Sequence, residues 1–195
     1  MNINWQLNEL DLKVVYYGPA LSGKTTNLEQ IHARIDPQRC SELVSLKTHD
    51  DRTLYFDFLQ IELSKISGLQ PKIHLYTVPG QICYEASRRL VLRGADGVVF
   101  VADSTPDRLE ANQASWEDLK KHLGAYHIPL ESLPLVIQCN KQDLAEALSP
   151  EHMKRELSMN GFTLVSAAAV KGEGVFDTLR AITMAVITNI QQEAV

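Results

Sequence analysis

Hydrophobic residues along this chain follow two patterns, one typical of strands and one typical of helices. Short apolar or alternating runs that end in polar or glycine-containing turns predict six strands, at residues 11–17, 54–63, 73–78, 97–102, 135–139 and 163–165. Apolar residues three or four positions apart predict four helices, at residues 24–35, 108–126, 150–157 and 175–190. The runs 97–102 and 135–139 are almost wholly apolar, so we expect them at the centre of a sheet that is covered on both faces.

Strands that alternate with helices in this way indicate an α/β fold with a mostly parallel six-stranded sheet and helices on both faces. The short polar connection between the strands 54–63 and 73–78 predicts one antiparallel strand. The alternation of Ile3, Trp5 and Leu7 is compatible with an extra N-terminal strand that pairs with the first main strand. No repeat or linker interrupts the pattern, so we expect a single domain over residues 1–195.

Composition and charge exclude several classes of protein. The chain has 19 basic and 24 acidic residues, a net charge of −5, which disfavours binding to nucleic acid or to an anionic membrane surface. Its 3 cysteines and 6 histidines show none of the paired spacings of zinc sites. The N-terminus lacks a secretory signal, no apolar run could cross a bilayer, and no lipidation motif stands at either end. We therefore expect a cytoplasmic protein without an intrinsic membrane anchor.

A phosphate-binding loop follows the first main strand. The segment Gly18–Thr25 fits the pattern Gly-x-x-x-x-Gly-Lys-Ser/Thr and opens a helix, the context that this motif requires. Its backbone N–H groups can face phosphate oxygens, the helix start adds partial positive charge, and Lys24 can lie between the β- and γ-phosphates. The Thr25 hydroxyl can bind Mg²⁺. The predicted phosphate-binding residues are Gly18, Ala20, Leu21, Ser22, Gly23, Lys24, Thr25 and Thr26.

Two later loops indicate which base is bound. Asn140-Lys141-Gln142-Asp143 matches the guanine-binding pattern Asn-Lys-x-Asp at the end of a buried strand. The carboxylate of Asp143 can accept hydrogen bonds from the two guanine N–H groups, whereas adenine would leave it unpaired. We expect the stem of Lys141 to lie along the base and Asn140 to tie loops together. After the next strand, the segment Ser166–Ala168 resembles the Ser-Ala-Lys loop of GTPases, with the Ala167 amide as the expected donor to guanine O6.

Two further segments have the position of the GTPase switch regions. The first is the polar stretch of residues 36–52, where Thr48 and the adjoining Thr53 are the candidates to complete the coordination of Mg²⁺. In the second, Thr77-Val78-Pro79-Gly80-Gln81, the N–H group of Gly80 can meet the γ-phosphate and Gln81 can orient the attacking water. The motifs together predict binding of GTP and GDP with Mg²⁺, and hydrolysis of GTP.

The sequence departs from the usual pattern at two positions that matter for hydrolysis. Thr77 stands where small GTPases carry a magnesium-binding Asp, and Asp50 or Asp51 is a candidate source of the missing charge. Ala20 adds a methyl group where Gln81 must approach the γ-phosphate. Both departures predict slow hydrolysis and leave open a second hypothesis, a module that holds nucleotide with negligible turnover. A third hypothesis, an ATP-using P-loop kinase or transport ATPase, is disfavoured by the guanine-binding motif.

The chain resembles the bacterial MglA family, the Ras-like GTPases of cell polarity and gliding motility. The resemblance extends from Tyr16-Tyr17-Gly18-Pro19 through Arg52–Phe58 to Phe100-Val101-Ala102-Asp103-Ser104, and its most specific segment is Leu75–Gln81. Within that segment the family shares Thr77, so this departure is a family trait. The family usually has Gly where this chain has Ala20.

The resemblance implies a small-GTPase fold and several roles that the residues alone leave open. It implies that Thr53 rather than Thr48 binds Mg²⁺, that Arg52 is an arginine finger supplied in cis, and that Gln81 orients water. It also implies a roadblock-type activating partner, usually a homodimer, and recruitment to a cell pole through partners. The sequence identifies neither an effector nor an exchange factor.

Overall fold

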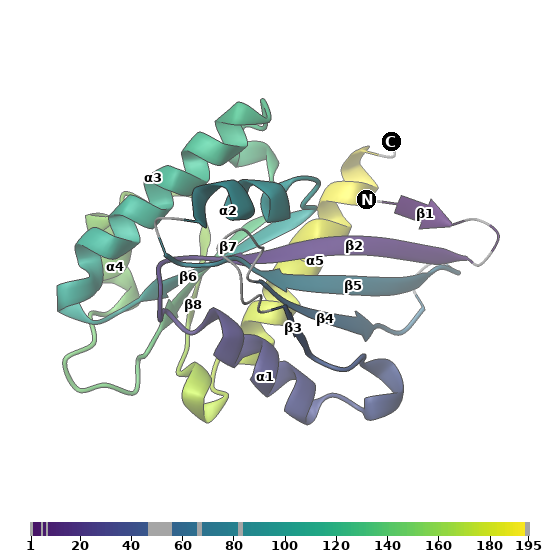
Figure 1. Cartoon of the computed structure of the whole chain (residues 1–195), viewed down its shortest axis with the longest axis horizontal. Coiled ribbons are helices and arrows are strands. Elements are labelled where there is room, and N and C mark those ends of the chain that lie inside the picture. Colours follow the sequence, from purple (N-terminus) through teal and green to yellow (C-terminus); the bar gives the residue numbers. More distant parts are fainter. Residues whose placement is uncertain are drawn as a thin grey trace.

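The sheet of this protein is larger than the sequence predicts. The computed structural model describes residues 2–4, 6, 8–46, 56–65, 68–81 and 84–193. Within these ranges the sheet has eight strands in the order β3-β4-β5-β2-β6-β7-β8, with β1 paired to the other side of β2 at its N-terminal end (Figure 1). The strands are β1 (Asn2–Asn4), β2 (Glu9–Tyr17), β3 (Val44–Leu46), β4 (Phe56–Glu62), β5 (Gln70–Thr77), β6 (Gly97–Asp103), β7 (Leu135–Asn140) and β8 (Thr163–Ser166).

The antiparallel parts of the sheet confirm two predictions and correct a third. The short β1 pairs antiparallel with β2, with Ile3 opposite Leu10, as the N-terminal alternation suggested. The neighbours β4 and β5 form the predicted antiparallel pair. The prediction of six strands with one antiparallel strand is wrong in its count, because β3 also pairs antiparallel with β4 at the sheet edge. A strand of three residues is too short to show a periodic pattern and depends on its partner.

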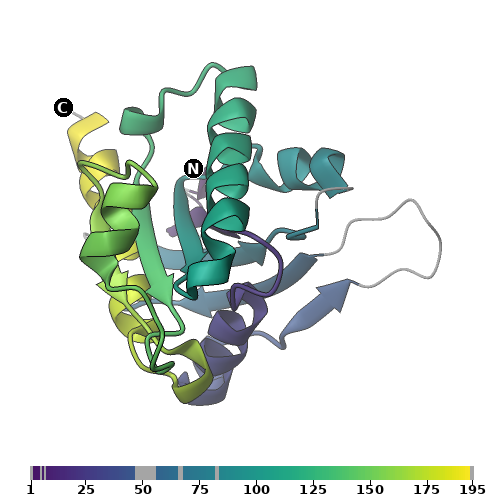
Figure 2. The same ribbon diagram turned by 90° about the vertical axis from the view of Figure 1, so that its left-hand side faces the viewer.

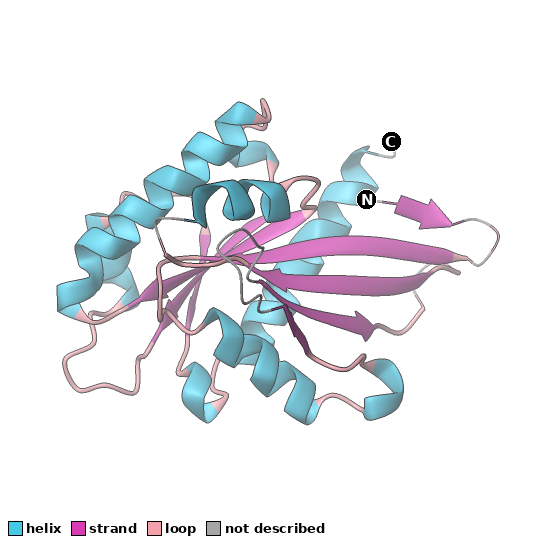
Figure 3. Cartoon of the chain, in the orientation of Figure 1, coloured by secondary structure: helices cyan, strands magenta, loops and turns pink. Residues whose placement is uncertain are grey.

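Helices cover both faces of the sheet (Figures 1, 2 and 3). The five α-helices of the described residues are α1 (Lys24–Arg34), α2 (Glu85–Leu92), α3 (Leu109–Ala125), α4 (Pro150–Glu156) and α5 (Val175–Glu193). The structure places α1 and α5 on one face and α2, α3 and α4 on the other. Four of these helices lie where the sequence predicts them. The fifth, α2, was missed because its eight residues are few and its buried face includes the charged Arg88.

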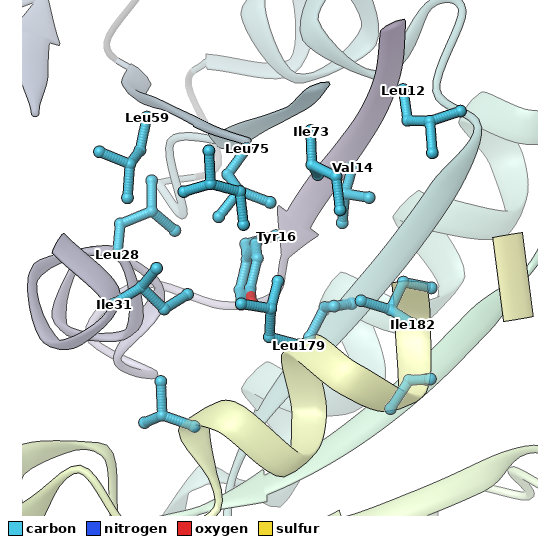
Figure 4. Close-up of a cluster of buried hydrophobic side chains, with 14 of the residues drawn as sticks. Leu12, Val14, Tyr16, Leu28, Ile31, Leu59, Ile73, Leu75, Leu179 and Ile182 are labelled. Carbon is cyan, nitrogen blue, oxygen red and sulfur yellow. The ribbon is translucent and has the colours of Figure 1, made fainter. Parts of the chain in front are cut away.

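Each face of the sheet has its own hydrophobic core. On the first face, Leu28 and Ile31 of α1 and Leu179 and Ile182 of α5 pack with Tyr16 of β2 (Figure 4). On the second face, Trp116 of α3 contacts Phe100 of β6, with ring centroids 5.1 Å apart. β6 and β7 are buried at every position, which confirms their central place in the sheet. Burial of apolar area on this scale is the main stabilising contribution to such a fold.

The predicted motifs gather at one edge of the sheet. The parallel strands β2, β5, β6 and β7 end at Tyr17, Thr77, Asp103 and Asn140, and the loops that follow them carry the predicted motifs. Ligands of open α/β sheets bind outside these carboxyl ends. None of the described helices combines the length and the apolar character that a membrane crossing needs.

Candidate functional site

The loop after β2 has a backbone shape that requires glycine at two positions. Gly18 has φ 143°, and a Cβ there would lie 2.3 Å from the carbonyl oxygen of Val101. Gly23 has φ 100°, and a Cβ there would lie 2.2 Å from Nδ2 of Asn140. A side chain at either position would clash and would strain the backbone. The two glycines of the motif therefore bring the loop against β6 and β7.

Lys24 lies under this loop and is almost fully buried. Its Nζ donates to the carbonyl oxygens of Gly18 at 2.9 Å and Pro19 at 2.6 Å. Burial and, to a smaller extent, the Arg88 guanidinium lower the pKa of the Lys24 ammonium to about 7, against the opposing effect of the Asp57 carboxylate. The ammonium is thus held where its positive charge is poorly solvated, which favours an anionic ligand beside it.

Asp57 of β4 is a site residue that the sequence analysis missed. Its Oδ2 accepts hydrogen bonds from the hydroxyl groups of Thr25 at 2.6 Å and Thr77 at 2.9 Å. Its Oδ1 accepts from the hydroxyl of Ser45 at 2.7 Å, and its own N–H donates to Thr77 Oγ1 at 2.8 Å. A carboxylate therefore stands next to Thr77, at the position where the pattern lacks its usual Asp.

The sequence does contain a signal for Asp57. In β4 the buried positions are 57, 59 and 61, and the other two carry Leu59 and Ile61. A carboxylate at an inward-facing position of an alternating strand needs hydrogen-bond partners or a cation, because burial of an unpaired charge is strongly unfavourable. The candidates that the sequence analysis named instead, Asp50 and Asp51, lie outside the described residues.

The phosphate-binding loop and the second switch segment line one cleft of about 620 Å³. Lys24, Thr25, Asp57, Thr77 and Gln81 all line it. Also in the lining, Gly80 lies against the loop, since a Cβ on it would be 2.4 Å from both N and Cα of Ala20. The full lining is Ala20, Leu21, Gly23, Lys24, Thr25, Thr26, Phe56, Asp57, Thr77, Val78, Pro79, Gly80, Gln81 and Tyr84.

A second cleft of about 210 Å³ adjoins the first. Both are lined by Leu21, Gly23 and Thr26, so they lie side by side along the same loop. The remaining lining of the second cleft comes from the loops that follow β7 and β8: Asn140, Lys141, Asp143, Leu144, Ala169 and Val170. The two volumes together suit a nucleotide whose phosphates lie in the first cleft and whose base lies in the second.

Asn140 links three loops at the base end. Its Nδ2 donates to the carbonyl oxygen of Ser22 at 2.7 Å, and its Oδ1 accepts from the N–H group of Ala169 at 2.9 Å. Next to it, Nζ of Lys141 donates to Oδ2 of the buried Asp103 at 2.5 Å. The linking role expected for Asn140 agrees with this geometry, and the pairing of Lys141 with Asp103 orients the lysine stem along the cleft.

The third predicted loop is arranged differently from the expectation. The amide of Ala167 donates to the carbonyl oxygen of Cys139 at 2.9 Å, and that of Ala168 donates to the carbonyl oxygen of Glu173 at 3.1 Å. Both residues are buried, and Ser166–Ala168 do not line the cleft. Ala169 and Val170 line it instead. The hydrogen bond from the Ala169 N–H group to Oδ1 of Asn140 holds the chain there, three residues beyond the end of β8. No local pattern in the sequence indicates this offset.

Three predicted residues belong to the stretch just before β4. Arg52 and Thr53 lie outside the described residues, as does the alternative Thr48. Their roles stay predictions.

Comparisons with known proteins extend over nearly the whole chain. The model of the ADP-ribosylation factor family, Arf, matches residues 2–186. The Mutual gliding-motility protein MglA of Myxococcus xanthus (strain DK1622) is 47% identical over 97% of this chain and 97% of its own length. ADP-ribosylation factor-like protein 1 of Saccharomyces cerevisiae is 27% identical over 90% of this chain and 87% of its own length. ADP-ribosylation factor-like protein 4C of Homo sapiens is 26% identical over 84% and 81%.

Proposed function

The chain belongs to the ADP-ribosylation factor family, as an MglA-type small GTPase that binds guanine nucleotide and hydrolyses GTP, and on this premise we propose that it is a switch for cell polarity or gliding motility. The observation that supports a switch best is the meeting of two kinds of segment in one cleft. Lys24 and Thr25 belong to the phosphate-binding loop, whereas Gly80 and Gln81 follow β5 in the second switch segment. In such proteins the switch segments respond to the γ-phosphate. The motility role rests on the name of the M. xanthus relative.

The oxygen atoms around Asp57 fit a Mg²⁺ ion. Mg²⁺ prefers hard oxygen ligands and is held in nucleotide sites by one or two protein groups and the phosphates. Thr25 and Asp57 are the groups that would hold it here, with Thr77 orienting the carboxylate and Thr53 as the candidate from the first switch segment. When bound, Mg²⁺ would neutralise charge on the β- and γ-phosphates. The fit rests on three hydroxyl groups that already point at one carboxylate.

The remaining residues divide between binding and catalysis. Lys24 would bind the phosphates, and Asp143 would accept the guanine N–H groups, with Ala169 and Val170 beside the base. Gln81 would orient the attacking water, and Arg52 would act as the arginine finger. Ala20 and Gln81 line the same cleft, and the Ala20 methyl group would crowd Gln81 at the γ-phosphate, which supports slow turnover without an activator. A roadblock-type homodimer is the activator that the family resemblance implies, and recruitment to a cell pole would follow from partners.

A nucleotide-binding and single-turnover experiment tests the proposal. The purified full chain in Mg²⁺ should bind labelled GDP, GTP should compete for it, and ATP should not. Hydrolysis should be slow alone and clearly faster with the roadblock-type companion from the same genome, since an arginine finger that operates is worth about 10³–10⁵ in rate.

The catalytic part is tested by Gln81→Ala, with Gln113→Ala as a matched control because Gln113 is exposed on α3. Gln81→Ala should keep GTP binding and lose the accelerated rate, whereas Gln113→Ala should change neither. An unchanged accelerated rate in Gln81→Ala would remove this residue from catalysis. Equal competition by ATP and GTP would contradict the base assignment.

A further inference from the structure

Three potential metal ligands meet between α2 and α3, outside the linings of the two clefts. Glu85 is the first residue of α2, and Asp118 and His122 lie one turn apart on α3. Figures 1 and 2 both show these helices side by side. Nε2 of His122 is 3.6 Å from Oε1 of Glu85 and 3.5 Å from Oδ1 of Asp118. All three atoms lie within 4.8 Å of one another.

The proton on the His122 ring can be placed from its neighbours. The Tyr17 hydroxyl donates its single hydrogen to Oδ2 of Asp118, 2.7 Å away. It can therefore only accept at its 3.1 Å contact with Nδ1 of His122, which puts the imidazole proton on Nδ1. Burial lowers the pKa of His122, against the opposing effects of Asp118 and Glu85, in agreement with a neutral ring. Nε2 then carries a lone pair that points at two carboxylates.

That lone pair is buried and unsatisfied. The His122 side chain is 2% exposed, and within the described part of the chain its Nε2 has no hydrogen-bond partner. Distances of 3.5 and 3.6 Å are too long for hydrogen bonds to the carboxylates. A cation bound there would satisfy the Nε2 lone pair and would also contact the two carboxylate oxygens that face it.

Two cations contact the carboxylates of the cluster, and one of them, Lys121, contacts an oxygen that faces His122. Arg88 Nε pairs with Oδ2 of Asp118 at 2.7 Å, and it is the other oxygen, Oδ1, that faces His122. Lys121 Nζ lies 2.8 Å from Oε1 of Glu85, but its side chain is 69% exposed and can turn into solvent. Lys121 is therefore a competitor that a bound ion would displace.

We propose that Glu85, Asp118 and His122 form a binding site for a borderline divalent transition-metal ion, with Zn²⁺ the best match. Four bonds of roughly 2.1 Å in a tetrahedron separate neighbouring ligand atoms by roughly 3.4 Å, close to the 3.5 and 3.6 Å found here. An imidazole nitrogen disfavours Mg²⁺ and Ca²⁺ as occupants. The hydrogen bond from Nδ1 to Tyr17 is the outer-shell contact that metal-binding histidines usually make. Water would complete the coordination.

The site is coupled to the second switch segment through Arg88. The guanidinium of Arg88 contacts Asp118 and donates to the carbonyl oxygens of Pro79 and Gln81. An ion bound by Asp118 and Glu85 would join the start of α2 to α3 directly behind these contacts. Occupancy should therefore hold residues 79–81 in the arrangement described here.

Titration of Zn²⁺ into the GDP-loaded full chain, in excess Mg²⁺ and followed by calorimetry, tests the site. We expect one Zn²⁺ to bind through the cluster, and Co²⁺ in its place to give the visible absorption of a tetrahedral site. Glu85→Gln should weaken binding at least about 10-fold, because it removes a charged ligand from an exposed position without disturbing the core. Lys121→Ala should strengthen it, because the competing ammonium is gone.

The matched control is Glu117→Gln, since Glu117 is an exposed glutamate of α3 that pairs with Lys120 outside the cluster. It should leave Zn²⁺ affinity unchanged. Absence of binding in the native chain, or binding that is the same in native protein and Glu85→Gln, would overturn the proposal. The second result would assign the ion to another part of the chain, such as the cysteine thiols.

Discussion

The two ends of the nucleotide cleft use their polar side chains in different ways. At the base end, Asn140 and Lys141 bind other protein groups, namely Ser22, Ala169 and Asp103, that a nucleotide would leave in place. At the phosphate end, the side chains proposed to contact phosphate or Mg²⁺ are hydrogen-bonded to protein groups that the ligand would replace. Lys24 donates to carbonyl groups of its own loop, and Thr25 donates to the Asp57 carboxylate.

This difference means that the base end of the cleft is preformed, whereas the phosphate end must exchange hydrogen bonds when nucleotide binds. Loops held together by buried hydrogen bonds keep their shape without ligand, and the ordering cost of binding there is small. At the phosphate end, nucleotide and ion would replace protein partners, so binding exchanges one set of hydrogen bonds for another. Substitutions at the base end should therefore change specificity, whereas those at the phosphate end should change affinity and the dependence on Mg²⁺.

The largest effect should come from Lys24→Ala at the phosphate end. It removes the buried ammonium that faces the phosphates, and we expect GDP affinity to fall by about 10³ or more, since loss of a buried charged partner costs several kcal/mol. Equilibrium binding of labelled GDP measures this. Lys65→Ala, which changes an exposed lysine after β4, should bind GDP normally. Near-native affinity in Lys24→Ala would disprove the phosphate-binding role.

Asp143→Asn should remove the preference for guanine and leave the phosphate end of the cleft unchanged. The amide offers one acceptor and one donor where guanine needs two acceptors, so GDP affinity should fall about 100-fold while weak ATP binding stays the same. Competition between GDP and ATP measures the ratio. The control is Glu146→Gln, an exposed acid in the same loop. If the preference for guanine survived in Asp143→Asn, the comparison between the two ends would fail.

Asp57→Asn should weaken Mg²⁺ binding without removing a group that contacts the nucleotide. The amide keeps the shape of the side chain and removes its charge, so the Mg²⁺ concentration needed to retain GDP should rise about 10-fold. The release rate of labelled GDP at a series of Mg²⁺ concentrations gives this value. Asp107→Asn, at an exposed position, serves as the control. A Mg²⁺ dependence like that of the native chain would show that the charge comes from elsewhere, such as Asp50 or Asp51.

The smallest expected effect is the uptake of a proton by Lys24 when nucleotide binds. The pKa of Lys24 is lowered to about 7 without ligand, and phosphate oxygens beside the ammonium should raise it. Uptake should then be about half a proton at pH 7 and should approach one at pH 8, so affinity should fall as pH rises above 7. Calorimetry in buffers of different ionisation enthalpy measures it. If a histidine titrated instead, proton uptake would decline between pH 7 and pH 8. That result would contradict the assignment to Lys24.

Much of this protein can be predicted from its sequence because the signals are local. The strand and helix periods depend on neighbours a few positions apart, and they predicted the central strands β6 and β7 and four of the five helices of the described residues. The phosphate-binding loop and the Asn-Lys-x-Asp segment are also contiguous, since a curled backbone needs glycines at fixed spacing. Their placement at strand ends followed from the parallel order of the sheet.

The remaining features depend on contacts between segments far apart in the chain. Asp57 reaches Thr25 and Thr77 only because β4 pairs with β5 in the observed register, in which Phe58 lies opposite Tyr76. At the base end, Ala169 rather than Ala167 lines the cleft, and this depends on the hydrogen bond between Asn140 and the Ala169 N–H group.

The cluster of Glu85, Asp118 and His122 likewise needs two helices side by side. A sequence determines directly what its near neighbours decide, namely element type and motif. Tertiary structure alone decides which distant carboxylate stands beside which hydroxyl or imidazole, because a shift of one residue in register would turn that side chain to the other face.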